Sequence, residues 1–248
     1  DMPPTLRVVP NEMTMDMHML GMMYAPTDKV TLMLMVNYLE NEMSHTTYAG
    51  MMGDTVQGEF TTRSSGFGDT KVGALISLYD TVSQKLHINA GLSVPTGSIT
   101  EEAVVLAPTG MNMTLRMPYP MQLGSGTYDL LPGITYNGFA GKLGWGAQSI
   151  ATLRTGENDE NYTLGDKLSA DAWLSYSPQH RVSFSVRAHY EQTDAIDGQD
   201  PQIMAPVQTA VPAFAEGDRA DIAFGVNYAM PSGHRLALEY QDTIEQSA

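Results

Sequence analysis

The chain has 248 residues, of which 42% are hydrophobic and none is cysteine, and it carries a net charge of −15 at neutral pH. No apolar stretch approaches the roughly 20 residues that a membrane-spanning helix requires, so the sequence excludes a helical membrane protein. The acidic balance leaves no basic surface for phosphates, which excludes nucleic acid as a partner.

Apolar and polar residues alternate with a period of two in ten successive segments. Successive side chains of a strand point to opposite faces, so this alternation predicts strands with one apolar and one polar face. The predicted strands span residues 12–25, 29–44, 57–80, 84–95, 126–137, 142–155, 164–177, 180–192, 217–229 and 234–244. Helical periodicity is not sustained anywhere. The sequence therefore predicts an all-β chain that forms a single domain over residues 1–248.

Three features of these segments favour a transmembrane barrel over a soluble sandwich. The segments are about ten residues or longer, whereas globular strands average nearer five or six. Their apolar faces often end in an aromatic residue, as at Tyr38 and Tyr228, which suits an interfacial girdle. Their polar faces carry charges, such as Arg187 and Glu191, which a dry interior would have to pair at high cost. We therefore predict an antiparallel up-and-down β-barrel in the bacterial outer membrane, surrounded by lipid and lipopolysaccharide.

Short and long connections alternate between the predicted strands. The long ones span residues 41–57, 95–126, 155–165 and 193–217. In outer-membrane barrels the short turns face the periplasm and the long loops face outside, so the first predicted strand runs inward and the last runs outward. A barrel with periplasmic ends then needs one more strand at each end. We predict about twelve strands, the first and last absent from this sequence; a closed ten-stranded barrel is the alternative.

Three stretches resemble a known family of outer-membrane proteins. They read SSGFGDTKVGA at residues 64–74, GLSVPTGSI at residues 91–99 and YPMQLGSGTYD at residues 119–129. The chain resembles the outer-membrane transporters related to the meta-pathway phenol-degradation protein, and its methionine-rich opening resembles one branch of that family. The resemblance implies a barrel of about the predicted size, a further strand at both ends and a role in transport. It implies no catalytic residues.

Methionine is unusually frequent, with 18 residues in all and twelve before Gly53. In the first predicted strand one face carries Glu12, Thr14, Asp16 and His18, and the other carries Met13, Met15, Met17, Met19 and Met23. If the charged face is the lumen, these five methionines face lipid, where they act as flexible apolar filler. In the second predicted strand Val30, Leu32 and Leu34 make the lipid face, so the methionines between them point inward.

The first predicted strand is expected to point its carboxylate and histidine inward, and the second its methionines. Soft and hard metal ligands would then meet inside the barrel. The predicted lumenal metal cluster consists of Asp16, His18, Met33, Met35, Met43 and His45. Thioethers suit Cu(I), so copper is the metal that such a cluster would bind, and no other cofactor is predicted. A second methionine group lies in the long loop at Met111, Met113, Met117 and Met121. The alternatives are that methionine only packs against lipid and a loop plug, or that it forms an apolar slide for an organic solute.

Charged and histidine side chains of both signs fall on the predicted lumenal faces. They are Asp69, Lys71, Lys85, His87, Asp129, Arg154, Asp171, Arg181, Arg187, His189, Glu191, Arg219, Asp221, Arg235 and Glu239. Opposed rows of such residues can pair and narrow the interior, or they can line a selective passage. The loop over residues 95–126 is long enough to fold inward as a constriction.

Motifs for catalysis are scarce, since no nucleophile elbow and no zinc-type spacing is present, and we predict no enzymatic activity. The leading hypothesis is a channel or transporter for a small solute, either a small organic molecule or a metal ion. The alternatives are a methionine-rich copper-binding protein that does not conduct, and a structural barrel with an occluded lumen.

Overall fold

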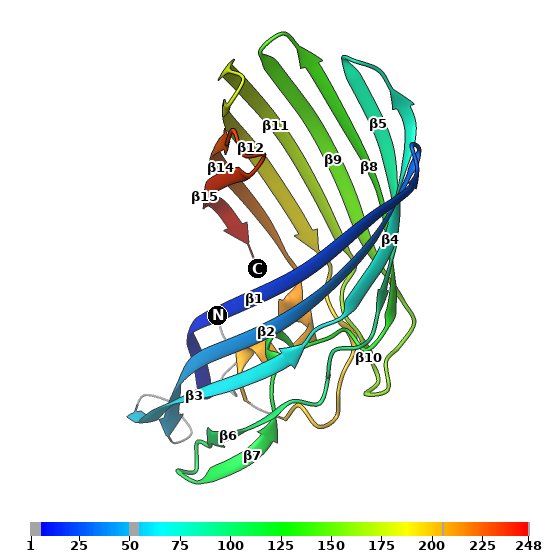
Figure 1. Cartoon of the computed structure of the whole chain (residues 1–248). Helices are drawn as coiled ribbons and strands as arrows, with labels where there is room; N and C mark the ends of the chain where they lie inside the picture. The colour runs from blue at the N-terminus through cyan, green and yellow to red at the C-terminus, as the bar shows by residue number, and fades with distance from the viewer. Residues whose placement is uncertain (1–5, 50–54, 205, 248) are drawn as a thin grey trace.

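The computed structural model describes residues 6–49, 55–204 and 206–247, and most of them lie in β-strands (Figure 1). The long strands are β1 (Val8–Thr27), β2 (Val30–Ala49), β3 (Thr55–Phe67), β4 (Thr70–Asp80), β5 (Gln84–Val94), β8 (Tyr128–Ala140), β9 (Leu143–Thr155), β11 (Lys167–Gln179), β12 (Val182–Thr193), β14 (Gly217–Ala229) and β15 (Arg235–Ser247). The short elements are β6 (Glu102–Leu106), β7 (Asn112–Arg116), η1 (Tyr119–Met121), β10 (Tyr162–Thr163), β13 (Asp197–Gly198), η2 (Gln208–Ala210) and η3 (Pro212–Ala215). No helix in these ranges is long and apolar enough to cross a membrane.

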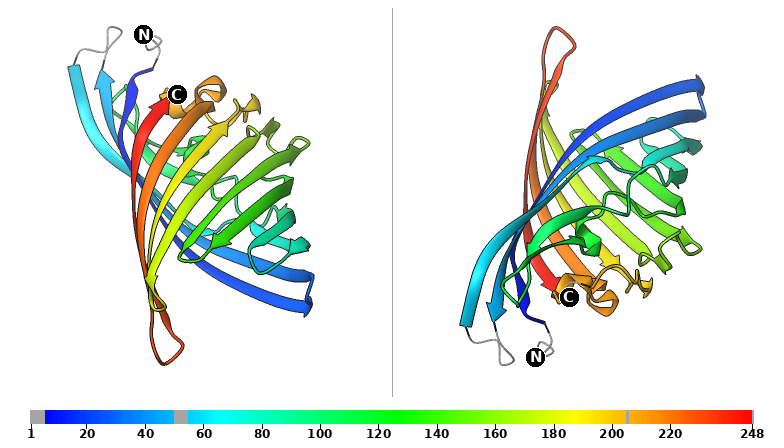
Figure 2. Two further views of the ribbon diagram at one scale, coloured as in Figure 1. Left: turned by 90° about the horizontal axis from the view of Figure 1, so that it is seen from above. Right: turned by 90° about the horizontal axis from the view of Figure 1, so that it is seen from below.

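One antiparallel sheet contains the long strands in the order β1-β2-β4-β5-β8-β9-β11-β12-β14-β15. β3 pairs with residues 38–49 of β2, and β4 pairs with residues 30–35 of the same strand. β3 and β4 therefore occupy one strand position, which is interrupted at Gly68 and Asp69. The sheet curls around a concave inner face and forms a half-barrel (Figures 1 and 2). These findings confirm the predicted all-β antiparallel fold.

Every predicted strand is present, and its bounds differ from the prediction by a few residues. β1 and β15 each pair with a single strand among the described residues, so these residues do not form the closed ten-stranded barrel that was the alternative. The additional first and last strands of a twelve-stranded barrel stay a prediction.

The predicted loop over residues 41–57 differs most from the structure. β2 continues to Ala49 and β3 begins at Thr55, and the two strands pair along this stretch. Residues 50–54 of the predicted loop lie outside the described residues. Polar residues occupy both faces of this part of β2 and β3, so the alternation that marks a half-buried strand is lost there.

The long connections lie at one end of the half-barrel, which we call the mouth. Their described residues are 95–127, 156–166, 194–204 and 206–216, and they contain all the short elements. The β6–β7 hairpin belongs to the first of them. The third reaches back to the start of the sheet, because Val8 forms a parallel bridge with Val207 and donates its main-chain N–H to the carbonyl of Pro206 at 3.0 Å.

The outer, convex face of the sheet is exposed, and it is largely apolar away from the mouth. Along β11 every second residue from Leu168 to Tyr176 is exposed, whereas the residues between them are half-buried. An aromatic pair, Tyr38 with Phe67, lies edge to face on the outer side of β2 and β3, with ring centroids 5.5 Å apart. An exposed apolar band bordered by aromatic residues is the surface that a transmembrane barrel presents to lipid.

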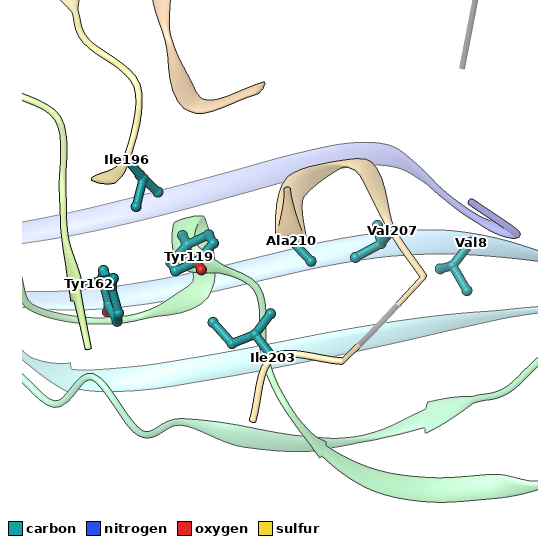
Figure 3. Packing of buried hydrophobic residues seen from close by; sticks show 7 residues of the cluster. All are labelled: Val8, Tyr119, Tyr162, Ile196, Ile203, Val207 and Ala210. Atoms are coloured by element: carbon teal, nitrogen blue, oxygen red, sulfur yellow. The ribbon is translucent and has the colours of Figure 1, made fainter. Parts of the chain in front are cut away.

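The main buried apolar cluster is formed by the mouth connections together with the start of β1, rather than along the sheet (Figure 3). Its main cluster consists of Val8, Tyr119, Tyr162, Ile196, Ile203, Val207 and Ala210. The rings of Tyr119 and Tyr162 meet edge to face with centroids 4.9 Å apart. Burial raises the pKa of both phenols, so both rings stay neutral near neutral pH. The mouth connections are therefore packed against each other as an ordered layer.

Candidate functional site on the inner face

The register of the sheet defines which side chains share the inner face. Residues that are directly opposed in an antiparallel ladder point to the same side of the sheet. Lys71 opposes Ser93, Ser93 opposes Asp129, and Asp129 opposes Arg154, so these four residues cross four strands on one face. This face is the concave one, because its side chains are less exposed than their neighbours and the mouth connections pack against it.

The register places nearly all of the predicted lumenal residues on this inner face. The residues at inner strand positions are Lys71, Lys85, His87, Asp129, Arg154, Asp171, Arg187, His189, Glu191, Arg219, Asp221, Arg235 and Glu239. Two predicted residues lie outside the strands. Asp69 occupies the break between β3 and β4, and Arg181 lies in the turn between β11 and β12.

A network of both charge signs covers the inner wall from β11 to β15. Arg187 donates to Asp171 at 3.1 Å and also contacts Glu239. His189 Nδ1 is hydrogen-bonded to the same Asp171 carboxylate at 3.0 Å. A second carboxylate, Asp221, accepts hydrogen bonds from Arg219, Gln241 and Thr243 at 2.7 to 2.8 Å. Charged residues thus occur on each of these strands, and they are largely paired with each other.

Asp69 holds both ends of the first mouth connection. Its carboxylate accepts hydrogen bonds from the main-chain N–H of Gly97 at 3.0 Å and from the N–H and hydroxyl of Ser125, both at 2.8 Å. Gly97 and Gly124 approach so closely that a Cβ on Gly97 would lie 2.6 Å from the carbonyl oxygen of Leu123. The three stretches that carry the family resemblance therefore meet at one carboxylate.

The first mouth connection then folds over the inner face of β2 and β3. The hydroxyl of Ser64 donates to the carbonyl of Met121 at 2.7 Å. Met117 and Met121 are buried and pack against Met43. The structure thus places Met117 and Met121 of the first mouth connection against the inner face of β2.

A buried ion pair joins the mouth connections to one another. Arg116, which is 6% exposed, donates to the fully buried Asp200 at 2.9 Å and to Gln202 at 3.1 Å. Glu160 of the second connection lies 3.5 Å from the same guanidinium. Neither Arg116 nor Asp200 was among the predicted site residues, because nothing in their local sequence brings together positions 84 residues apart.

The structure overturns the predicted orientation of the first strand. Met13 opposes Met43, Met23 opposes Met33, and Met35 opposes Lys71, so these side chains share the inner face. Eight methionines lie in this position, and we call them the methionine row: Met13, Met15, Met17, Met19, Met23, Met33, Met35 and Met43. The row extends along β1 and β2 from the mouth to the turn between the two strands. The five methionines of β1 that were expected to face lipid thus face inward.

The carboxylates and the histidine of β1 lie on the other side of the sheet. Asp16 opposes Glu40, and His18 opposes Tyr38, on the outer face. Glu42 continues this face and pairs with Arg63 at 2.9 Å, which lowers the pKa of that carboxyl. The prediction took the charged face of β1 as the lumenal one. This part of β1 extends past the aromatic pair at Tyr38. Aromatic girdles border the lipid band of a barrel, so we expect the outer face beyond this pair to meet water, and charge does not mark the lumen there.

The predicted metal cluster is therefore not formed as a unit. Met33, Met35, Met43 and His45 lie on the inner face, whereas Asp16 and His18 lie on the outer face. The loop methionines also separate, since Met117 and Met121 are buried and Met111 and Met113 are exposed on the β6–β7 hairpin. Within the described ranges, no three His, Cys, Asp or Glu side chains gather as metal ligands would.

Comparisons with known proteins agree with this geometry. A family model described as "Putative MetA-pathway of phenol degradation" matches residues 27–247. The chain belongs to that family. No curated protein matches the chain. The methionine-rich branch of the family that the sequence suggested stays a prediction.

Solved structures resemble the half-barrel. The COG4313 outer membrane channel from Pseudomonas putida F1 matches with a TM-score of 0.62 and 14% identity, over 94% of this chain and 78% of that chain. OmpT, an outer membrane protein of Vibrio cholerae, matches with a TM-score of 0.43 and 11% identity, over 92% and 84% of the two chains. The first likeness shows the fold of an outer-membrane β-barrel. Together with the exposed apolar outer face, it confirms the predicted location in the bacterial outer membrane.

Proposed function

We propose that this protein forms a channel that carries small solutes, either small organic molecules or metal ions, across the bacterial outer membrane. The observation that carries the proposal is the division of the sheet into an apolar outer face and an inner face with charges of both signs. Lipid and lipopolysaccharide contact the outer face, and water in the lumen solvates the inner one. The similarity to a protein named as an outer membrane channel supports the same role.

The inner wall supports passage of a solute that has both polar and apolar parts. The paired charges of β11 to β15 occupy one part of the wall, and the methionine row occupies another. Paired charges in a lumen determine which solutes pass, both through their electric field and because they set the width of the passage. Thioethers supply an apolar surface that adapts its shape to the solute.

The mouth connections support control of this passage at its outer end. Residues 95–127 cover part of the inner face, and Asp69 fixes both ends of the segment. The same packing also favours the rival proposal, a structural barrel with an occluded lumen, since Arg116 and Asp200 bind the connections together. Conduction separates the two proposals.

The test is single-channel recording with the full-length protein reconstituted in planar bilayers. We expect discrete conductance steps from the natural protein. Substitution of Asp69→Ala removes the three hydrogen bonds to Gly97 and Ser125, so the constricting segment loosens and the steps become larger or more variable. Asp80→Ala is the matched control, because it removes a carboxylate from an exposed pair with Lys85 far from the mouth. An absence of steps from both the natural protein and Asp69→Ala, with no solute uptake by liposomes, would contradict the proposal.

A further inference from the structure

Three thioethers form a buried group where the methionine row reaches the mouth. Met43, Met117 and Met121 are 2%, 1% and 0% exposed and pack together, and we call them the mouth cluster. Met43 comes from β2, whereas the other two come from the connection that folds over it. Met13 of β1 packs half-buried against the group. Methionine side chains from three separate segments thus pack together in the tertiary fold.

A buried imidazole lies next to this cluster. His45 shares the inner face with Met43, two residues away, and is only 2% exposed. Its ring stacks on Phe60 with centroids 4.7 Å apart, and its Nδ1 makes no hydrogen bond of regular geometry. The main chain of Met43 interacts with this ring, but burial of a polar nitrogen without a regular hydrogen bond is costly, and a ligand at this nitrogen would remove that cost. A small apolar cavity is lined by both His45 and Met117.

The charges around the cavity do not oppose a cation. Arg116 is the basic residue on the cavity wall, and its guanidinium lies 2.9 Å from Asp200 and 3.5 Å from Glu160. Neutral imidazole is the form that coordinates metals. The local balance of charge is therefore compatible with one positive ion.

We propose that the mouth cluster and His45 bind a soft monovalent cation of the Cu(I) class. Thioether sulfur with imidazole nitrogen is a ligand set that favours such ions over Mg²⁺ or Ca²⁺, which require oxygen ligands. Below the cluster the methionine row supplies further thioethers along β1 and β2 as far as Met23 and Met33. Binding does not require conduction. The further step, that such a cation is a solute of this channel, rests on the function proposed above.

The test is titration of the full-length protein, labelled with ¹³C-methyl methionine and held in detergent micelles, with Ag(I) as a redox-inert probe. We expect the methyl resonances of the mouth cluster to shift before those of Met22, Met111 and Met113, which are exposed away from it. Cu(I) affinity is then measured without oxygen against a competing chelator. Shifts that begin at the exposed methionines, or no shifts at all, would overturn the proposal.

Matched variants locate the site. The triple substitution Met43→Leu, Met117→Leu and Met121→Leu keeps side-chain volume, so the fold should persist while Cu(I) affinity falls about tenfold or more. The control triple Met22→Leu, Met111→Leu and Met113→Leu removes as many thioethers and should leave the affinity unchanged. Equal affinity in the two triple variants would overturn the proposal.

Two further measurements keep the result interpretable. His45→Phe preserves the stack on Phe60 and tests the imidazole alone, so its affinity for Cu(I) should fall even if the triple variant does not fold. Natural affinity in a folded His45→Phe protein would remove His45 from the site and overturn that part of the proposal. Conductance of the natural protein in potassium chloride, without added metal, tests the channel function separately, so loss of metal binding and failure of the channel function are told apart.

Discussion

Single residues decide how the mouth is built. Asp69 receives hydrogen bonds from residues 28 and 56 positions later in the chain, and the glycines at positions 97 and 124 allow the main chains around it to approach closely. Any side chain at either glycine would collide with the opposing main chain. The short sequence blocks that carry the family resemblance thus hold the two ends of the first mouth connection at Asp69, and they do not form a catalytic centre.

His45 predicts a pH dependence of stability. Its pKa in the folded protein lies below its ordinary value of about 6.5, mainly because the ring is buried. As pH falls through about 6.5 the unfolded chain takes up a proton that the folded chain does not, so the free energy of unfolding decreases until the folded pKa is reached. His45→Phe removes this loss. Among the described residues, Arg116 is the charged one on the nearby cavity wall, and its guanidinium pairs with Asp200.

This dependence is measured by urea unfolding of the natural protein and of His45→Phe between about pH 7.5 and about pH 5. We expect the natural protein to lose more stability on acidification than the variant does. Because the other five histidines are common to both proteins, parallel curves would show that His45 does not contribute.

Strands β1 and β2 change their environment along their length. Near their shared turn the outer face carries Leu32 and Leu34 and meets lipid, whereas past Tyr38 it carries Glu40 and Glu42 and meets water. The inner face changes less, since methionine recurs on it from one end to the other. The polarity of a face therefore identifies the lumen only within the lipid band.

Cysteine labelling tests the orientation of β1. The chain has no cysteine, so a single introduced thiol gives an unambiguous signal. We expect Met17→Cys, on the inner face, to react with a water-soluble maleimide in reconstituted vesicles. Met22→Cys, which opposes Leu34 on the outer face, should be protected by lipid. The reverse labelling pattern would show that the sequence-based orientation was right and the register wrong.

The sheet of this molecule has no buried apolar core of its own, whereas the mouth has one. The outer face of the sheet meets lipid, so the buried apolar residues gather among the three mouth connections (Figure 3). Arg116 ties these connections together through Asp200 and Glu160. The stability of the mouth should therefore depend on this ion pair more than on any surface pair of the sheet.

Removing one partner of the pair tests that dependence. Arg116→Met leaves the carboxylate of Asp200 buried without its counter-charge, which costs about 3–5 kcal/mol. The double variant Arg116→Met, Asp200→Asn removes both charges and should recover part of the loss. The free energy of unfolding of both variants is measured by urea titration. The exposed pair of Lys85 and Asp80 is the control, and Lys85→Met should cost about 1 kcal/mol or less. A double variant as unstable as Arg116→Met would show that the pairing is not the cause.

The sequence by itself determined the strands, their approximate bounds and the inner position of most charges, because alternation with a period of two is a local signal. It determined the family for the same reason, since the three motifs are short and contiguous. It misplaced the upper part of β2 and β3 as a loop, where both faces are polar and the local signal vanishes.

Only the tertiary structure decided which way β1 faces, because the register with β2 fixes that face whatever its polarity. It alone brought Met43 to Met117 and Met121, and Arg116 to Asp200. These contacts join segments that are far apart in the chain, and no local pattern encodes them. These contacts form because the long connections fold over the inner face, and the same folding produces the candidate site at the mouth.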